Sequence, residues 1–217
     1  MKVGLFIPCY IDQFYPNVGI STLQLLEKLG LEVEVPPNQT CCGQPLANSG
    51  MERNTVKICS HFINLFKEFD AIVSPSGSCV LQIKEHIPKE LHDENYLKVQ
   101  DNIYELTEFI TDVLNVDSLG GKFNCRVGLH QSCHSLRGLR NAKSTEKLLS
   151  SLKGIELVDL DRKDECCGFG GTFSVFEEGV SVQMGKDRIK DHEIHGAEII
   201  TATDMSCLMH LEGLVKR

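Results

Sequence analysis

The chain has 217 residues, 41% of them hydrophobic, which can fill one large core or two compact ones and excludes a small disulfide-stapled module. Thirty acidic against 22 basic residues give a net charge of −8, and no Lys/Arg block offers a surface for nucleic acid or anionic lipid. No apolar run reaches the roughly 18 residues that span a bilayer, and the N-terminus indicates a strand rather than a secretion signal, so we expect no transmembrane segment and a cytoplasmic location.

Strand and helix signals alternate along the first half of the chain. Residues 2–8 form a short apolar strand that runs into Cys9. Residues 21–35 have helical periodicity and then alternate as a strand, with Gly30 at the change. A Cys-Cys-Gly loop follows, and residues 70–74 predict another apolar strand that leads to a further cysteine.

The second half repeats the first. Residues 126–133 (RVGLHQSC) match residues 2–9 (KVGLFIPC), and in each half a Cys-Cys-Gly loop begins after a further 31 or 32 residues. Between the halves, residues 97–122 predict one helix and a glycine-bearing linker. We therefore predict two repeats, residues 1–122 with the linker helix and residues 123–217.

Alternating strands and helices favour the α/β class. Consecutive strands joined through helices form parallel βαβ units with right-handed crossovers, so we predict two pseudo-symmetric repeats of such units. Ligands of these folds collect beyond the carboxyl ends of the strands. The matched cysteines all lie at or just after predicted strand ends, or in the loops there.

Eight of the ten cysteines fall into two matched sets of four. Such a number in a reducing compartment favours metal or redox chemistry over disulfides. Cys59 and Cys125 have no counterparts, and Cys59 lies in an apolar periodic stretch typical of a core. Gly43 and Gly168 follow the cysteine pairs and let each loop curl so that both sulfurs face one centre. The candidate ligands are Cys9, Cys41, Cys42 and Cys79 in the first half and Cys133, Cys166, Cys167 and Cys207 in the second.

Four converging thiolates repel one another unless a cation lies between them. Zinc usually takes its cysteines from two short C-x₂₋₄-C pairs, and neither half contains C-x-x-C. Iron–sulfur clusters accept wider and more varied spacings. We therefore favour iron–sulfur binding, with up to two [4Fe–4S] clusters per chain, and keep a zinc-stabilised interaction module as the alternative.

The segments CCGQPLANSG (residues 41–50), CCGFGGTFSV (residues 166–175) and TDMSCLMHLEG (residues 203–213) carry a family resemblance. The chain resembles the cysteine-rich (CCG) domain proteins, which include the B subunit of heterodisulfide reductase, the iron–sulfur subunit of glycolate oxidase and the lactate-utilisation protein A group. Resemblance to the last group implies an electron-transfer subunit of a three-component complex that oxidises L-lactate to pyruvate. Its implied partners are a ferredoxin-type iron–sulfur protein and a smaller subunit; no residue is assigned a catalytic role.

One departure from the heterodisulfide reductase branch bears on the chemistry. In that branch each half ends in C-x-x-C, and five thiolates hold a noncubane cluster, whereas the first of these positions is Ser76 or Asp204 here. Thiol/disulfide reduction is thus a further alternative with less support. Ser76 and Asp204 are interpreted as helix N-caps, with a ligand or proton-acceptor role open for Asp204.

Polar residues near the cysteines are interpreted mainly as structural. His130, His134 and His210 are candidate hydrogen-bond donors to a cluster or proton relays. Arg137 and Arg140 are expected to be exposed. Residues 168–173 (GFGGTF) lack the Lys-Ser/Thr of a phosphate-binding loop, so no nucleotide is predicted.

Overall fold

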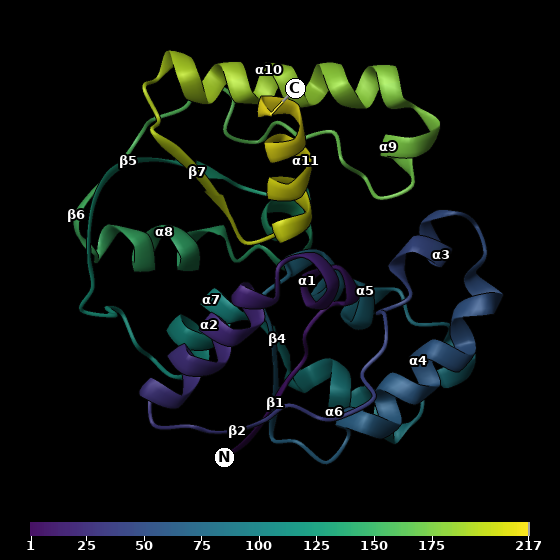
Figure 1. Ribbon diagram of the computed structural model, residues 1–217. Helices are drawn as coiled ribbons and strands as arrows, with labels where there is room; N and C mark the ends of the chain where they lie inside the picture. Colours follow the sequence, from purple (N-terminus) through teal and green to yellow (C-terminus); the bar gives the residue numbers. More distant parts are fainter. Residues whose placement is uncertain (217) are drawn as a thin grey trace. The chain divides into compact units, whose positions relative to one another are not determined.

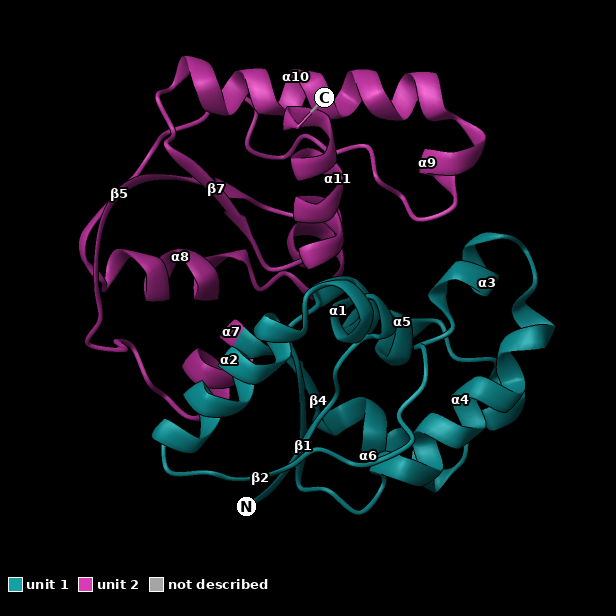
Figure 2. Cartoon of the chain, in the orientation of Figure 1, with its two compact units in different colours: residues 1–106 teal, residues 107–217 magenta. Residues whose placement is uncertain are grey.

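The computed structural model describes residues 1–216 and divides into two compact units, Met1–Leu106 and Thr107–Arg217 (Figure 2). Each unit is an α/β fold with its own parallel sheet. The predicted α/β class with two repeats of parallel βαβ units is therefore confirmed. The boundary between the two sequence repeats, placed between residues 122 and 123, stays a prediction.

The first unit contains a four-stranded sheet of order β2-β1-β3-β4 with all strands parallel. Strands β1 and β3 occupy the middle because their apolar side chains are buried on both faces, which a sheet covered by helices allows. Helix α4 packs against α6 (Figure 1). The strands are β1 (Lys2–Leu5), β2 (Glu32–Glu34), β3 (Ala71–Ser74) and β4 (Ile103–Glu105). The helices are α1 (Cys9–Phe14), α2 (Pro16–Lys28), α3 (Gln44–Asn48), α4 (Glu52–Phe66), α5 (Gly77–Glu85), the 3₁₀ turn η1 (Lys89–Leu91) and α6 (Glu94–Asn102).

The single helix predicted within residues 97–122 is wrong. That segment contains the end of α6, strand β4, the short helix α7 (Leu106–Glu108) and a π-helical turn, η2 (Phe109–Val113). Strand β4 forms because Ile103 pairs with Ile72 of β3 and is fully buried there. Pairing with the open edge of the sheet is a non-local interaction that overrides local helical periodicity.

The second unit contains a three-stranded parallel sheet of order β6-β5-β7. Helix α8 connects β5 to β6, and α10 lies between β6 and β7 in the chain (Figure 1). The strands are β5 (Lys122–His130), β6 (Lys153–Leu157) and β7 (Ile199–Ala202). The helical segments are the π-helical turn η3 (His134–Leu139), α8 (Ala142–Ser150), α9 (Phe173–Phe176), α10 (Glu178–Ile194) and α11 (Met205–Val215). No helix within residues 1–216 combines the length and the apolar character that crossing a membrane requires.

Candidate metal centres

The first cysteine site, defined by Cys9, Cys41, Cys42 and Cys79, lies at the carboxyl edge of the first sheet. Cys9 opens α1 just after β1, and Cys79 lies in the first turn of α5 just after β3. Cys41 and Cys42 belong to the loop between β2 and α3. Parallel strands end on the same edge of a sheet, so the three segments bring their cysteines together there.

The sulfur atoms of the first site form a series of contacts, from Cys9 to Cys41, from Cys41 to Cys42 and from Cys42 to Cys79. The Sγ atoms of Cys42 and Cys79 are 3.3 Å apart, and the Gly43 N–H donates to the Cys41 Sγ at 3.4 Å. Thiol hydrogen bonds from Cys42 and Cys9 lower the pKa of Cys41 to about 3. The same contacts raise the pKa values of Cys9 and Cys42. Without a cation, we expect such a quartet to hold one thiolate, Cys41, with neighbouring thiols that donate hydrogen bonds to it.

The second cysteine site, defined by Cys133, Cys166, Cys167 and Cys207, has the same construction. Cys133 follows β5, and Cys207 lies in the first turn of α11 after β7. Contacts with the thiols of Cys133 and Cys167 lower the pKa of Cys166 to about 2, and the Gly168 N–H donates to its sulfur at 3.4 Å. Contacts with the thiols of Cys166 and then Cys207, together with burial, raise the pKa of Cys167.

Both sites fit a metal centre by the chemistry of their donors. Each offers four sulfur atoms. Thiols that bind a metal ion lose their protons, so all four cysteines of a site could then be thiolates, with the cation balancing their charge. The backbone N–H of Gly43 or Gly168 would remain as a donor to a sulfur atom. The geometry thus favours thiolate ligation at both sites, while the assignment of these eight residues as iron ligands stays a prediction.

The glycines of the two Cys-Cys-Gly loops adopt left-handed backbone conformations, with φ of +89° at Gly43 and +88° at Gly168. This conformation turns the chain directly after the cysteine pair, as predicted. Gly170 and Gly171 are also left-handed, in keeping with an irregular loop at residues 168–173.

The two positions that differ from the heterodisulfide reductase branch both precede helices. Ser76 caps α5, because its hydroxyl accepts from the Cys79 N–H at 3.5 Å, and this prediction is confirmed. Asp204 occupies the equivalent position before α11, but its carboxylate accepts from the Ser206 hydroxyl at 2.8 Å and makes no side-chain cap. Asp204 is fully buried. The pKa of Cys133 is raised mainly by its contact with Cys166 and by burial, with a smaller contribution from Asp204.

Of the other predicted polar residues, most have structural contacts. His134 Nδ1 lies 3.6 Å from the Cys133 Sγ, and His210 Nε2 lies 3.3 Å from the Ser181 carbonyl oxygen. Arg137 donates to the Asp164 carbonyl at 2.9 Å and is exposed, as is Arg140. The second-site neighbour with the most distinctive surroundings is His130.

His130 is fully buried at the end of β5. One of its ring nitrogens and the Sγ atoms of Cys167 and Cys207 all lie within 4.8 Å of one another. Burial, together with the charge of Arg188 and with His192, lowers the pKa of His130 to about 3, so the ring is neutral. Arg188 and His192 were not singled out from the sequence. Comparing the helices that follow the two Cys-Cys-Gly loops would have found them, because polar residues replace apolar ones there.

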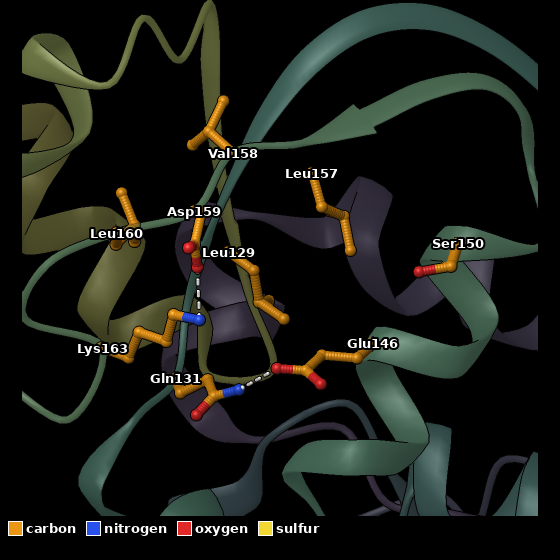
Figure 3. Close-up of a pocket in the computed structure, with 9 residues that line it drawn as sticks. All are labelled: Leu129, Gln131, Glu146, Ser150, Leu157, Val158, Asp159, Leu160 and Lys163. Atoms are coloured by element: carbon orange, nitrogen blue, oxygen red, sulfur yellow. Dashed lines mark hydrogen bonds and ion pairs between the residues drawn. The ribbon is translucent and has the colours of Figure 1, made fainter.

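A pocket on the other side of β5 has no cysteine among its described lining residues. Leu129 in β5 and Gln131 just after it line this pocket (Figure 3). Successive side chains of a strand point to opposite faces, so the pocket lies on the face of β5 away from His130. Gln131 donates to Glu146 at 2.6 Å, and Lys163 pairs with Asp159. These polar groups satisfy one another, so the pocket adds nothing to the metal centre.

Cys59 lies behind the first Cys-Cys-Gly loop. It is fully buried in α4, and a Cβ atom added to Gly43 would lie 3.7 Å from its sulfur. Cys125 is half-buried in β5, and its thiol contacts the Glu198 carboxylate.

Cys59→Ala is expected to leave the iron content of the purified protein unchanged. The quartet already supplies four sulfurs, and the loss of one small buried side chain costs about 1–2 kcal/mol of stability. Iron and zinc analysis of the variant beside the wild type checks this, with Cys125→Ala as the control outside the first site. A selective loss of iron from the first site in Cys59→Ala would make Cys59 a ligand.

Two α/β units, each with a Cys-Cys-Gly loop and two strand-end cysteines gathered at one sheet edge, define a two-repeat cysteine-rich protein. The family model described as the cysteine-rich domain (CCG) matches residues 3–84 and 127–212. The chain belongs to the CCG cysteine-rich domain family, and the predicted resemblance is confirmed.

Relatives match over the whole chain. It is 42% identical to "Lactate utilization protein A" of Bacillus subtilis (strain 168) and to the protein of the same name from Geobacillus sp. (strain WCH70), over 100% of this chain and 93% of each relative. It is 40% identical to "Lactate utilization protein A" of Macrococcus caseolyticus (strain JCSC5402), over 100% of this chain and 90% of that relative.

Proposed function

We propose that this chain is the cytoplasmic iron–sulfur electron-transfer subunit of a complex that oxidises L-lactate to pyruvate. The observation that carries the proposal is the gathering of four cysteine sulfurs at one sheet edge in each unit. The names of its relatives support lactate utilisation as the process. The other components would be a ferredoxin-type iron–sulfur protein and a smaller subunit.

The division of labour follows from the chemistry of the reaction. Oxidation of lactate to pyruvate releases two electrons and two protons. Bound iron–sulfur clusters would supply electron storage, and the two sets of four cysteines match the ligand demand of up to two [4Fe–4S] clusters, one in each repeat. The part of this chain is to hold eight thiolates in position and to set the polarity around them. Because each cysteine site lies in its own unit, the chain can carry two redox centres.

Anaerobic purification followed by iron and acid-labile sulfide analysis tests the proposal. We expect a brown protein with a broad visible absorption band and about four irons and four sulfides per filled site. The control is the same preparation after iron chelation, which should lose the band. Stoichiometric zinc without sulfide would contradict the proposal and favour the zinc module, whereas a noncubane paramagnetic signal that responds to thiols would favour disulfide chemistry.

A further inference from the structure

The two units differ at the place where the sheet meets the helix behind each cysteine site. In the first unit, three buried aromatic rings fill this place: Phe6, three residues before Cys9, and Phe62 and Phe66 on α4. The Phe6 ring lies 4.8 Å from Phe62 and 5.8 Å from Phe66, centroid to centroid. We call these residues the aromatic cluster; it is an ordinary apolar core.

The second unit has polar residues at the equivalent positions. His130 lies three residues before Cys133, as Phe6 does before Cys9. The Cys-Cys-Gly loops set the helix register, because a Cβ on Gly43 would contact Thr55 of α4 and a Cβ on Gly168 would contact Ser181 of α10.

With Thr55 and Ser181 aligned, the helix positions 7 and 11 residues further on are Phe62 and Phe66 in α4 but Arg188 and His192 in α10. Together with His130, these two residues form what we call the polar triad. All three members of the triad are buried like their aromatic counterparts.

The polar triad lacks the full set of partners that buried groups normally have. Arg188 Nε donates to His192 Nε2 at 3.3 Å, and its Nη1 pairs with Asp191 at 3.1 Å. Within residues 1–216, Arg188 Nη2, His192 Nδ1 and both ring nitrogens of His130 have no hydrogen-bond partner. Burying such groups is unfavourable, and a native protein that does so usually has a functional reason.

The unpartnered imidazole of His130 is directed at the second cysteine site, because a ring nitrogen lies within 4.8 Å of the Cys167 and Cys207 sulfurs. A fifth ligand is not required there. The first site has the same four cysteines with Phe6 at this position, and a phenyl ring cannot ligate a metal. A donor N–H facing sulfur, with a buried guanidinium behind it, fits the arrangement better.

We propose that His130 hydrogen-bonds to sulfur at the second centre and so raises the reduction potential of that centre above the value it would have with an apolar residue at this position. Both N–H donors and positive charge stabilise the reduced, more negative state. The inference rests on the proposed function.

The test is a redox titration of the anaerobically loaded wild type and His130→Phe, followed by electron paramagnetic resonance. Cys41→Ser assigns the signals, since it should remove that of the first centre. The wild-type titration gives the reference potential of each centre. In His130→Phe its one-electron reduction equilibrium should weaken at least tenfold, about 59 mV, with iron and sulfide content unchanged.

Matched variants separate the effect of the lost hydrogen bond on the reduction potential from the effect of altered packing. His130→Gln keeps an N–H donor and should stay close to the wild-type potential, while His130→Leu replaces His130→Phe should the latter fail to fold. Phe6→Leu changes the same position of the first unit without removing a donor and should leave both potentials in place.

Two results would overturn the inference: an unchanged potential in His130→Phe, or loss of iron from the second site, which would make His130 a ligand. Absence of labile sulfide from the wild type would instead defeat the proposed function itself.

Discussion

Cys41→Ser is expected to remove about half of the bound iron and sulfide and to leave the second centre intact. Cys41 is the thiolate that accepts hydrogen bonds from Cys9 and Cys42, so its sulfur contacts two of the other three in the first quartet. Serine is a poor ligand for iron at neutral pH, because its hydroxyl does not ionise there. The second cysteine site lies in a separate unit with its own sheet and should keep its cluster.

Iron and sulfide analysis of the variant, together with its paramagnetic spectrum, measures this effect. Cys166→Ser is the matched control, since it changes the equivalent thiolate of the second site and should remove the other half. Equal loss from both centres in either variant would show that the sites are interdependent or that one cluster is shared between them.

Gly168→Ala is expected to destabilise the second unit much more than Gly43→Ala destabilises the first. Both glycines have φ near +90°, so each alanine would cost about 1–2 kcal/mol of backbone strain. Their surroundings differ. A Cβ on Gly43 would meet Thr55 at 3.4 Å, whereas a Cβ on Gly168 would lie 2.6 Å from the Ser181 carbonyl oxygen.

The backbone of α10 cannot give way as a side chain can, so overpacking should add about 1–3 kcal/mol at Gly168 only. Urea denaturation of the two variants, with iron analysis of each, measures the difference. We expect Gly168→Ala to lose its second cluster and Gly43→Ala to retain most of its first. Equal destabilisation by the two alanines would mean that α10 moves away from the loop at little cost.

The parts of the fold predicted correctly depend on local patterns. The strand before Cys9, the helix that ends near Gly30 and the Cys-Cys-Gly turns follow from periodicity and from the conformational freedom of glycine. Strand β4 was missed because Ile103 becomes a strand residue only when the edge of β3 is available to pair with it. No pattern within residues 97–122 carries that information.

The sequence predicted how the cysteines group but not what surrounds them, and their role as ligands stays a prediction. The matched spacing of the eight cysteines was enough to assign them to two quartets. His130 was noticed only because it lies near Cys133. Arg188 and His192 are more than 50 residues away from it in the chain, and their place beside it depends on how α10 packs on β5.

The sequence alone determined that this protein has two α/β repeats and two sets of four cysteines at strand ends, because a repeat and the order of strands along the chain are properties of the chain itself. Only the tertiary structure decided that the two sites have unlike surroundings, an aromatic cluster behind one and a polar triad behind the other. The physical reason is that burial and contact between a strand and a distant helix are set by packing, which spacing along the chain does not specify.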